Sequence, residues 1–204
     1  MKPYEIEQKS FSIIRKELKE MGKELPERTA PVIMRCIHTS ADFSYADTLA
    51  FSDGVIDTAI DLLRNGATVV TDTNMALAGI RTGQLVGFGG KAVCFMADES
   101  VAKEAKERET TRAFVSMERA AELAGPVVFA IGNAPTALLS LHEMVQKGSY
   151  RPAMVIGVSV GFVNVKSAKE IIMGDGIPYI VNRGRKGGSN IAAAIINALL
   201  GMAL

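Results

Sequence analysis

The chain has 204 residues, of which 48% are hydrophobic and 22% are charged, and its formal net charge is +1. This length and balance predict one folded domain with a sizeable core, and they argue against a disordered chain or a general nucleic-acid-binding protein. No stretch approaches the roughly 18 apolar residues that a membrane span needs, and the amino terminus lacks the apolar centre of a secretory signal, so we expect a cytoplasmic protein.

The first third of the chain is predicted to be mostly helical. Apolar residues recur at helical spacing over Tyr4–Met21. A second helix is expected over Pro26–Ile37, with Pro31 tolerated only in its first turn. This assignment places His38 just beyond the end of that helix. A third helix, capped by residue 52 or 53, is expected to end at Gly66.

From residue 67 onward, short runs rich in β-branched residues alternate with helical segments. Strands are expected at Ala67–Thr71, Lys91–Met96, Pro126–Ile131, Ala153–Val158 and Ile177–Val181. Helices are expected at Asn74–Ile80, Ser100–Lys106, Thr110–Ala124, Ala134–Lys147, Val165–Met173 and Ser189–Met202. Nearly continuous apolarity in the strands means that both sheet faces are covered. The pattern predicts an α/β fold: a single Rossmann-like domain with a mainly parallel five-stranded sheet and helices on both faces.

The residues that follow the predicted strands are small or polar. In folds of this class, ligands bind beyond the carboxyl ends of the strands. Asp72 follows the first of these strands, Asn133 follows the third, and the segment 182–190 follows the fifth. We therefore expect the binding site at this edge of the sheet.

The segment 182–190, with the sequence NRGRKGGSN, combines basic side chains with glycines before the last helix. Glycines allow close approach of the backbone to a ligand, and free amides at a helix start favour an anion. The segment lacks the spacing of a phosphate-binding P-loop, which disfavours a nucleotide. Carboxylates fit equally well because arginine pairs with them in bidentate geometry. A basic, solvated loop without a ligand is the alternative.

His38 is one of only two histidines, and it lies in the sequence MRCIHTSAD. An imidazole titrates near neutrality and can act as acid or base. An ordinary hydrogen-bonded or surface histidine is the alternative on local grounds. His142, inside a predicted helix, is interpreted as structural.

Other catalytic chemistries find no support in the sequence. There is no nucleophile elbow, no pair of histidines at metal-ligand spacing and no Cys-x-x-Cys motif. Cys36 and Cys94 are interpreted as buried free thiols. Covalent and metal catalysis therefore have no support, and we expect proton transfer to a small polyanion.

Seven segments in one order along nearly the whole chain resemble the precorrin-8X methylmutase family, also called cobalt-precorrin-8 methylmutases, of cobalamin biosynthesis. They are SFSIIRKEL, MRCIHT, NGATVVTDTNMALAGI, TTRA, AIGNAPTALLSL, GVSVGFV and VNRGRKGGSNIAAA. Two positions depart from the family pattern: Ser159 stands where proline is usual, and Lys186 stands at a variable position.

The resemblance implies an isomerase that moves a methyl group between adjacent carbons of ring C in a contracted tetrapyrrole, without a cofactor. The product is then a corrin, hydrogenobyrinic acid or cobyrinic acid. The resemblance also implies that His38 is the general acid, which agrees with the local interpretation of an isolated proton carrier. The acetate and propionate groups of such a substrate account for the arginines.

The resemblance further implies substrate contacts at positions that match the family motifs. These are Ser10, Arg35, Thr39, Asp72, Arg112, Asn133, Arg183, Gly184, Arg185, Gly187 and Gly188. It implies a homodimer, with a polycarboxylate tetrapyrrole and its corrin product as ligands and no nucleic acid or membrane as partner. A non-catalytic corrinoid carrier is the alternative function, and a nucleotide-binding protein is a weaker one. The sequence leaves open whether the substrate carries cobalt.

Overall fold

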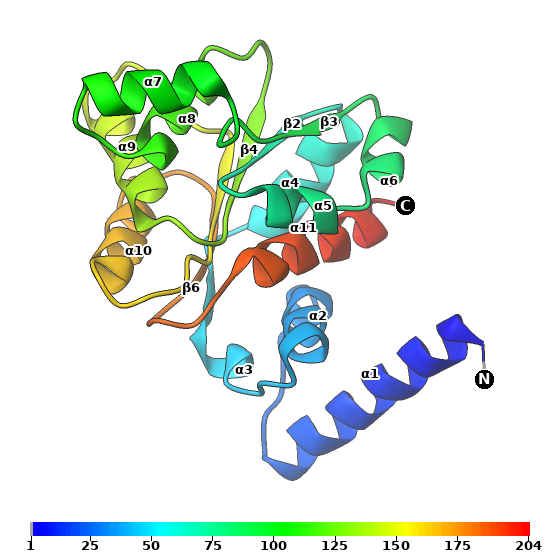
Figure 1. Cartoon of the computed structure of the whole chain (residues 1–204). Coiled ribbons are helices and arrows are strands. Elements are labelled where there is room, and N and C mark those ends of the chain that lie inside the picture. The colour runs from blue at the N-terminus through cyan, green and yellow to red at the C-terminus, as the bar shows by residue number, and fades with distance from the viewer. Residues whose placement is uncertain (1) are drawn as a thin grey trace.

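In the computed structural model, which describes residues 2–204 apart from the side chains of Pro3 and Tyr4, the chain folds around one sheet (Figure 1). Its six strands have the order β1-β6-β5-β4-β2-β3. Their bounds are β1 Leu49–Phe51, β2 Thr68–Thr71, β3 Lys91–Val93, β4 Val127–Ile131, β5 Met154–Gly157 and β6 Tyr179–Asn182. All neighbours pair in parallel except β1 and β6. The predicted mainly parallel α/β fold is therefore confirmed.

The predicted strand number of five was wrong, because β1 adds an antiparallel edge. β1 has only three residues, all half-buried, and follows a single helical turn, α3 (Tyr45–Thr48). Three residues are too few to show a strand period in the sequence. Leu49 lies opposite Asn182, so β1 holds the segment after α2 against the last parallel strand.

Helices cover both faces of the sheet, as predicted. The bounds of those on the first face are α2 Ala30–Ser40, α4 Val55–Arg64, α5 Asn74–Gly79 and α11 Ser189–Ala203. The bounds of those on the second face are α8 Arg112–Ala121, α9 Pro135–Gln146 and α10 Val165–Met173. In β4, Val128 and Ala130 pack toward the first group, whereas Phe129 and Ile131 pack toward the second. Two apolar layers therefore sandwich the sheet.

Two further helices complete the body of the molecule. α7 (Glu99–Glu107) packs on α8 through a small apolar cluster, and α6 (Thr82–Gly87), which the sequence did not predict, precedes β3. Within residues 2–204, no helix combines the length and apolarity required to cross a bilayer.

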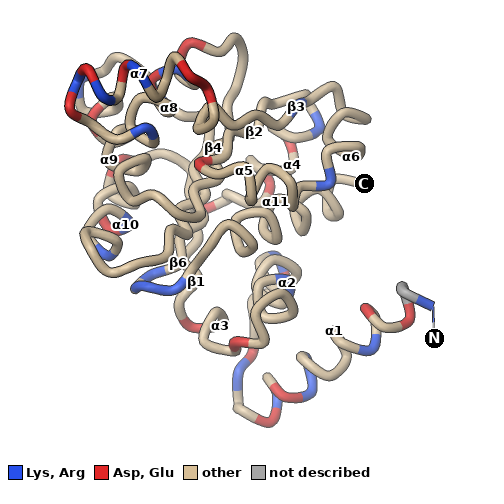
Figure 2. The backbone as a smooth tube through the Cα atoms, viewed as in Figure 1, with Lys and Arg blue, Asp and Glu red and all other residues tan. Residues whose placement is uncertain are grey.

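The first helix, α1 (Pro3–Glu20), leans outward from the body and packs its apolar side on α2 (Figure 1). Ile14 and Leu18 are buried in this contact, while charged residues alternate along the remaining surface of the helix (Figure 2). Lys23 also forms an ion pair with Asp47, which fastens the segment after α1 to α3. The predicted opening helix is confirmed.

Helix α2 has Pro31 in its first turn, as predicted, but it extends one turn beyond the predicted end at Ile37. His38 therefore lies in the last turn of the helix, and its predicted place just beyond the end was wrong. The hydroxyl groups of Thr39 and Ser40 donate to the carbonyl oxygens four residues earlier, at 2.9 and 2.8 Å. These bonds allow two small polar residues to continue the helix up to Ala41, whose φ of 55° ends it.

Candidate active site

The carboxyl ends of the parallel strands form one edge of the molecule, at which four long helices also begin. α9, α10 and α11 each follow a strand at this edge, and α8 begins beside α9, where the Thr111 hydroxyl donates to the Thr136 hydroxyl at 3.1 Å. Their amino termini carry the positive ends of the helix dipoles. The helix dipoles therefore contribute positive potential at this edge.

Asp72 supports this edge from within and does not face solvent. Its side chain is fully buried after β2, and its carboxylate accepts hydrogen bonds from the backbone amides of Gly132, Asn133 and Ala134 at 2.6–2.9 Å. Burial raises the pKa of Asp72, and these amide bonds oppose that shift. Asp72 therefore stabilises the turn between β4 and α9. Because its side chain is fully buried, it is not placed for the predicted direct contact with substrate.

The glycine-rich loop after β6 is held tightly by its neighbours. The amide of Gly188 donates to the carbonyl of Val158 at 2.9 Å, and Gly187 passes so close that a Cβ there would lie 1.9 Å from the same oxygen. Gly187 also has a φ of 157°. This close approach explains why the position requires glycine, and it seats the start of α11 against the loop after β5.

A buried lysine secures the same loop from the other side. Lys169 of α10 is fully buried, and its ammonium group donates to the carbonyl oxygens of Gly184 and Lys186 at 3.0 Å each. Asn182 donates to the Lys186 carbonyl as well, at 2.8 Å. Desolvation lowers the pKa of Lys169 to about 8. Sequence reasoning missed this residue, because a lysine within an amphipathic helix is normally solvated.

Three basic residues of the loop, Arg183, Arg185 and Lys186, are exposed, whereas its backbone is held by hydrogen bonds; Figure 2 marks where these residues lie along the chain. The Arg183 guanidinium lies 3.8 Å from the Glu170 carboxylate, and Arg185 lies over the Phe162 ring at 5.7 Å from its centroid. The Lys186 ammonium donates to Asp42 at 2.6 Å, which lowers the pKa of that carboxyl. Because Asp42 follows α2 directly, this ion pair brings the end of α2 beside the loop.

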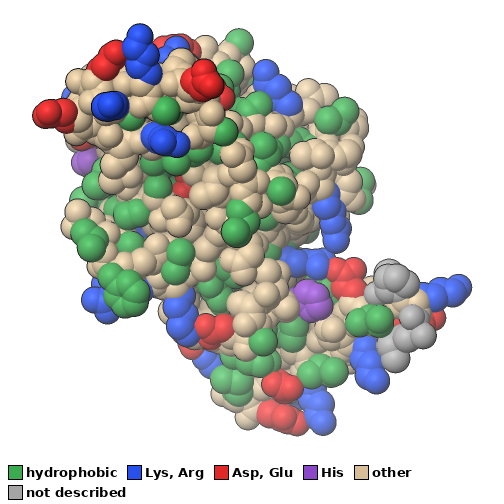
Figure 3. Space-filling model, in the orientation of Figure 1, with side chains coloured by type: hydrophobic (Ala, Val, Ile, Leu, Met, Phe, Trp, Pro, Cys, Tyr) green, Lys and Arg blue, Asp and Glu red, His purple; other side chains and the backbone are tan. Residues whose placement is uncertain are grey.

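His38 is exposed and lies in a layer of side chains contributed by α1 and α2. Its ring centroid is 5.3 Å from that of Phe11, and the Arg35 guanidinium lies over the same phenyl ring at 4.8 Å. Arg35 donates in turn to the Glu7 carboxylate at 2.5 Å. Figure 3 shows a histidine exposed beside acidic and basic groups where α1 meets the body. His38 and Arg35, one helical turn apart on α2, therefore contact the same phenyl ring.

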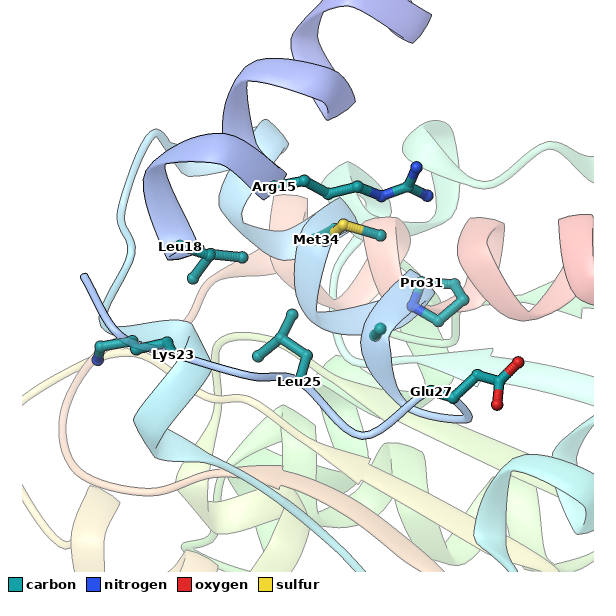
Figure 4. A pocket seen from close by; sticks show the side chains of 8 residues that line it. Arg15, Leu18, Lys23, Leu25, Glu27, Pro31 and Met34 are labelled. Atoms are coloured by element: carbon teal, nitrogen blue, oxygen red, sulfur yellow. The ribbon is translucent and has the colours of Figure 1, made fainter. Parts of the chain in front are cut away.

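Two grooves flank this layer. One, of about 320 Å³, is lined by His38 and Ser10 together with apolar side chains of α1 and α2. The other, of about 310 Å³, is lined by Arg35 and Thr39 together with residues of α5 and α11. The hydroxyls of Ser10 and Thr39 each donate to a backbone carbonyl of their own helix at 2.9 Å. A third hollow, between α1 and α2, contains none of the predicted site residues (Figure 4).

Arg112 and Asn133 lie on the other flank of the edge. Both are exposed, with Arg112 opening α8 and Asn133 in the turn that Asp72 holds. The predicted residues thus form two groups, one on α1 and α2 and one on the strand-end loops, joined through the ion pair between Lys186 and Asp42. Beyond Lys169, sequence reasoning missed Glu7 and Phe11 as neighbours of His38 and Arg35. The signal for Glu7 was its place one helical turn before Ser10, and the signal for Phe11 was only the apolar periodicity of the opening helix.

The comparisons with known proteins agree over the full fold. The family model described as "Precorrin-8X methylmutase" matches residues 5–202. The chain belongs to this family. It is 40% identical to a cobalt-precorrin-8 methylmutase from Leptospira interrogans, with 96% of this chain and 91% of that protein aligned. It is 36% identical to a precorrin-8X methylmutase from Pseudomonas aeruginosa, over 95% and 93% of the two chains.

A solved structure extends the agreement to three dimensions. The precorrin-8X methylmutase from Thermus thermophilus superposes with a TM-score of 0.87 at 36% identity, covering 97% of this chain and 96% of that one. As a methylmutase of this family, the chain is an isomerase of cobalamin biosynthesis.

The second histidine and the cysteines are accounted for outside the site. His142 Nδ1 lies 2.9 Å from both carboxylate oxygens of Asp175, so it ties α9 to the turn after α10, as its structural interpretation predicted.

Cys36 is buried, and burial raises the pKa of its thiol to about 12. Cys94, predicted to be buried, is partly exposed. Within residues 2–204, no three acidic, histidine or cysteine side chains are grouped to hold a metal ion.

Proposed function

We propose that this methylmutase moves a methyl group between adjacent carbons of ring C in precorrin-8, or in its cobalt complex, to give hydrogenobyrinic acid or cobyrinic acid. The observation that carries the proposal is His38, exposed in a groove with Ser10 between α1 and α2 of a chain that belongs to the methylmutase family. His142, the other histidine, is engaged by Asp175 and lies on a different flank.

In this proposal His38 is the general acid. It donates a proton to the nitrogen region of ring C, which lowers the barrier to the sigmatropic shift by drawing electron density from the migrating centre. Because the product is an isomer of the substrate, no atom is gained or lost overall, and the proton returns to the imidazole. A positioned acid contributes on the order of 10²–10⁴ in rate. The exposed imidazole, stacked on Phe11, is available for both transfers.

The surrounding groups suit a ligand with many carboxylates. Four arginines supply guanidinium groups for these carboxylates: Arg35, Arg112, Arg183 and Arg185. The backbone of the glycine-rich loop supplies further contacts with the ligand. Asn133 is exposed for a further polar contact. Asp72 holds the turn that presents it. Bidentate guanidinium pairs would fix the orientation of the ring above His38.

The test compares the two histidines. Purified wild-type protein and the His38→Ala and His142→Gln variants are incubated with metal-free and with cobalt-containing substrate while visible absorption is followed. We expect wild type and His142→Gln to form the corrin spectrum and His38→Ala to form none while still binding product. Turnover by His38→Ala at the wild-type rate would exclude the acid role. A wild-type protein that binds the corrin yet never forms it would instead be a carrier.

The active form is proposed to be a homodimer. Apolar side chains are exposed in the loop after β5, where Phe162 and Val163 have 85% and 78% of their surface accessible. Such a patch at the edge of the site suits association with a second copy. Sedimentation equilibrium should give twice the chain mass, and a monomer at micromolar concentration with full activity would exclude this proposal.

A further inference from the structure

An arginine that the sequence did not single out faces the same groove as Arg35 and Thr39. Arg81 lies between α5 and α6 and lines this groove together with residues of α2, α5 and α11. Arg35 and Arg81 also line a further hollow, of about 290 Å³, that has not been described above and lies nearer the end of α11. Two guanidinium groups from separate elements therefore converge on one concave surface.

The position of Arg81 is set by a side chain of α11. The Asn197 amide oxygen accepts a hydrogen bond from the backbone amide of Arg81 at 2.8 Å, and its amide nitrogen donates to the carbonyl of Gly79 at 2.8 Å. Ile80, between these two contacts, is buried. The turn is thus fastened at two points to the helix that forms the floor of the groove, while the Arg81 side chain itself remains exposed.

The guanidinium group of Arg81 makes no ion pair with the residues that the structure describes. Its positive charge nevertheless attracts the carboxylate of Glu7, to which Arg35 donates a hydrogen bond. The pKa of Glu7 is lowered chiefly by its hydrogen bond with Arg35, and attraction to Arg81 and to His38 adds to this shift. Glu7 provides one negative charge for two guanidinium groups, so the groove retains positive charge for an anionic ligand.

This groove lies close to the proposed acid. Thr39, which lines it, directly follows His38, and Arg35 shares the Phe11 ring with the imidazole. We propose that Arg81 is a substrate-binding residue that holds one peripheral carboxylate of the tetrapyrrole in the groove between α2, α5 and α11. This inference rests on the proposed function, and it adds a carboxylate anchor on the first face of the sheet, away from Arg112.

The test uses two corrins that differ in charge. Binding of cobyrinic acid, which has free carboxylates, and of a fully amidated corrin is measured by absorption titration with wild type and with Arg81→Gln. We expect Arg81→Gln to bind cobyrinic acid about tenfold more weakly, since a hydrogen-bonded charge pair is lost. Its affinity for the amidated corrin should equal that of wild type. With the precorrin substrate, KM should rise about tenfold at unchanged kcat.

The control removes one positive charge elsewhere. Lys106→Gln lies on α7, on the far side of the sheet from the groove, and should match wild type in every measurement. Arg81→Lys should fall between wild type and Arg81→Gln, because lysine keeps the charge without the bidentate fork. Unchanged cobyrinic acid binding by Arg81→Gln, or an equal loss for both corrins, would overturn the inference. An inactive wild-type protein would mark failure of the proposed function instead.

Discussion

The imidazole of His38 rests against the phenyl ring of Phe11, with ring centroids 5.3 Å apart and ring planes inclined by 33°. The two residues belong to different helices, so the orientation of the proposed acid depends on the docking of α1 on α2. The same ring also carries the Arg35 guanidinium. One phenyl group therefore contacts both the proposed proton donor and the proposed carboxylate anchor.

Replacing Phe11 with leucine should lower kcat roughly tenfold, because apolar volume is kept while the flat surface that orients the imidazole is lost. Stopped-flow absorption of the corrin product measures the effect. Ile6→Leu, an exposed change on the same helix, is the control and should leave the rate unchanged. A Phe11→Leu enzyme with wild-type kcat would show that the ring does not position His38.

Replacing Asp72 with asparagine should destabilise the fold by about 2–4 kcal/mol, because an amide group would point a donor at backbone amides that need an acceptor. Urea unfolding followed by circular dichroism gives the free energy of unfolding. Asp61→Asn, on the exposed side of α4, is the matched change and should lie within about 0.5 kcal/mol of wild type. Equal stability of the two variants would contradict the structural role of Asp72.

Lys169 should make stability rise with pH in alkaline solution. Its pKa is about 8 in the folded protein, against an ordinary value of 10.5, so the unfolded chain binds more protons between these values. The cost of burying the charge is fully present below pH 8 and is relieved as the pH rises toward 10.5. We expect the free energy of unfolding to gain on the order of 2 kcal/mol from this group between about pH 7.5 and 9.5.

The Lys169→Met variant should lose that pH-dependent gain, and it should also bind cobyrinic acid more weakly, because the carbonyls of Gly184 and Lys186 lose their donor. Lys166→Met, on the exposed face of the same helix, should keep the wild-type pH profile. Parallel profiles for wild type and Lys169→Met in urea titrations at each pH would contradict this account.

Two glycines of the basic loop should respond differently to alanine. At Gly187 the added Cβ meets the Val158 carbonyl, and we expect a loss of at least about 2 kcal/mol in stability together with weaker corrin binding. At Gly184 an added Cβ would meet no atom within 4 Å. Only the φ of +83° opposes alanine there, at a cost of about 1 kcal/mol. Thermal unfolding of both variants measures the difference, and a reversed order would contradict the packing described at Gly187.

Local patterns in the sequence were sufficient for the central part of the fold. All five parallel strands, and the helices between them apart from the short α6, have apolar or β-branched runs long enough to show a period, so their places were predicted within a few residues. β1 and α3 were missed because each is only three or four residues long and depends on pairing with β6 or packing on α2. The end of α2 was misplaced because side-chain bonds of Thr39 and Ser40, which leave no periodic signal, extend the helix.

By itself, the sequence determined the fold class and the family to which the chain belongs, because these depend on residue types in order along the chain. Only the tertiary structure decided which residues meet. It buried Asp72 beneath the turn that presents Asn133, placed Lys169 under the basic loop, and brought Arg81 and Arg35 to the same groove. Such contacts join residues tens of positions apart, and their partners are chosen by the packing of helices on a sheet.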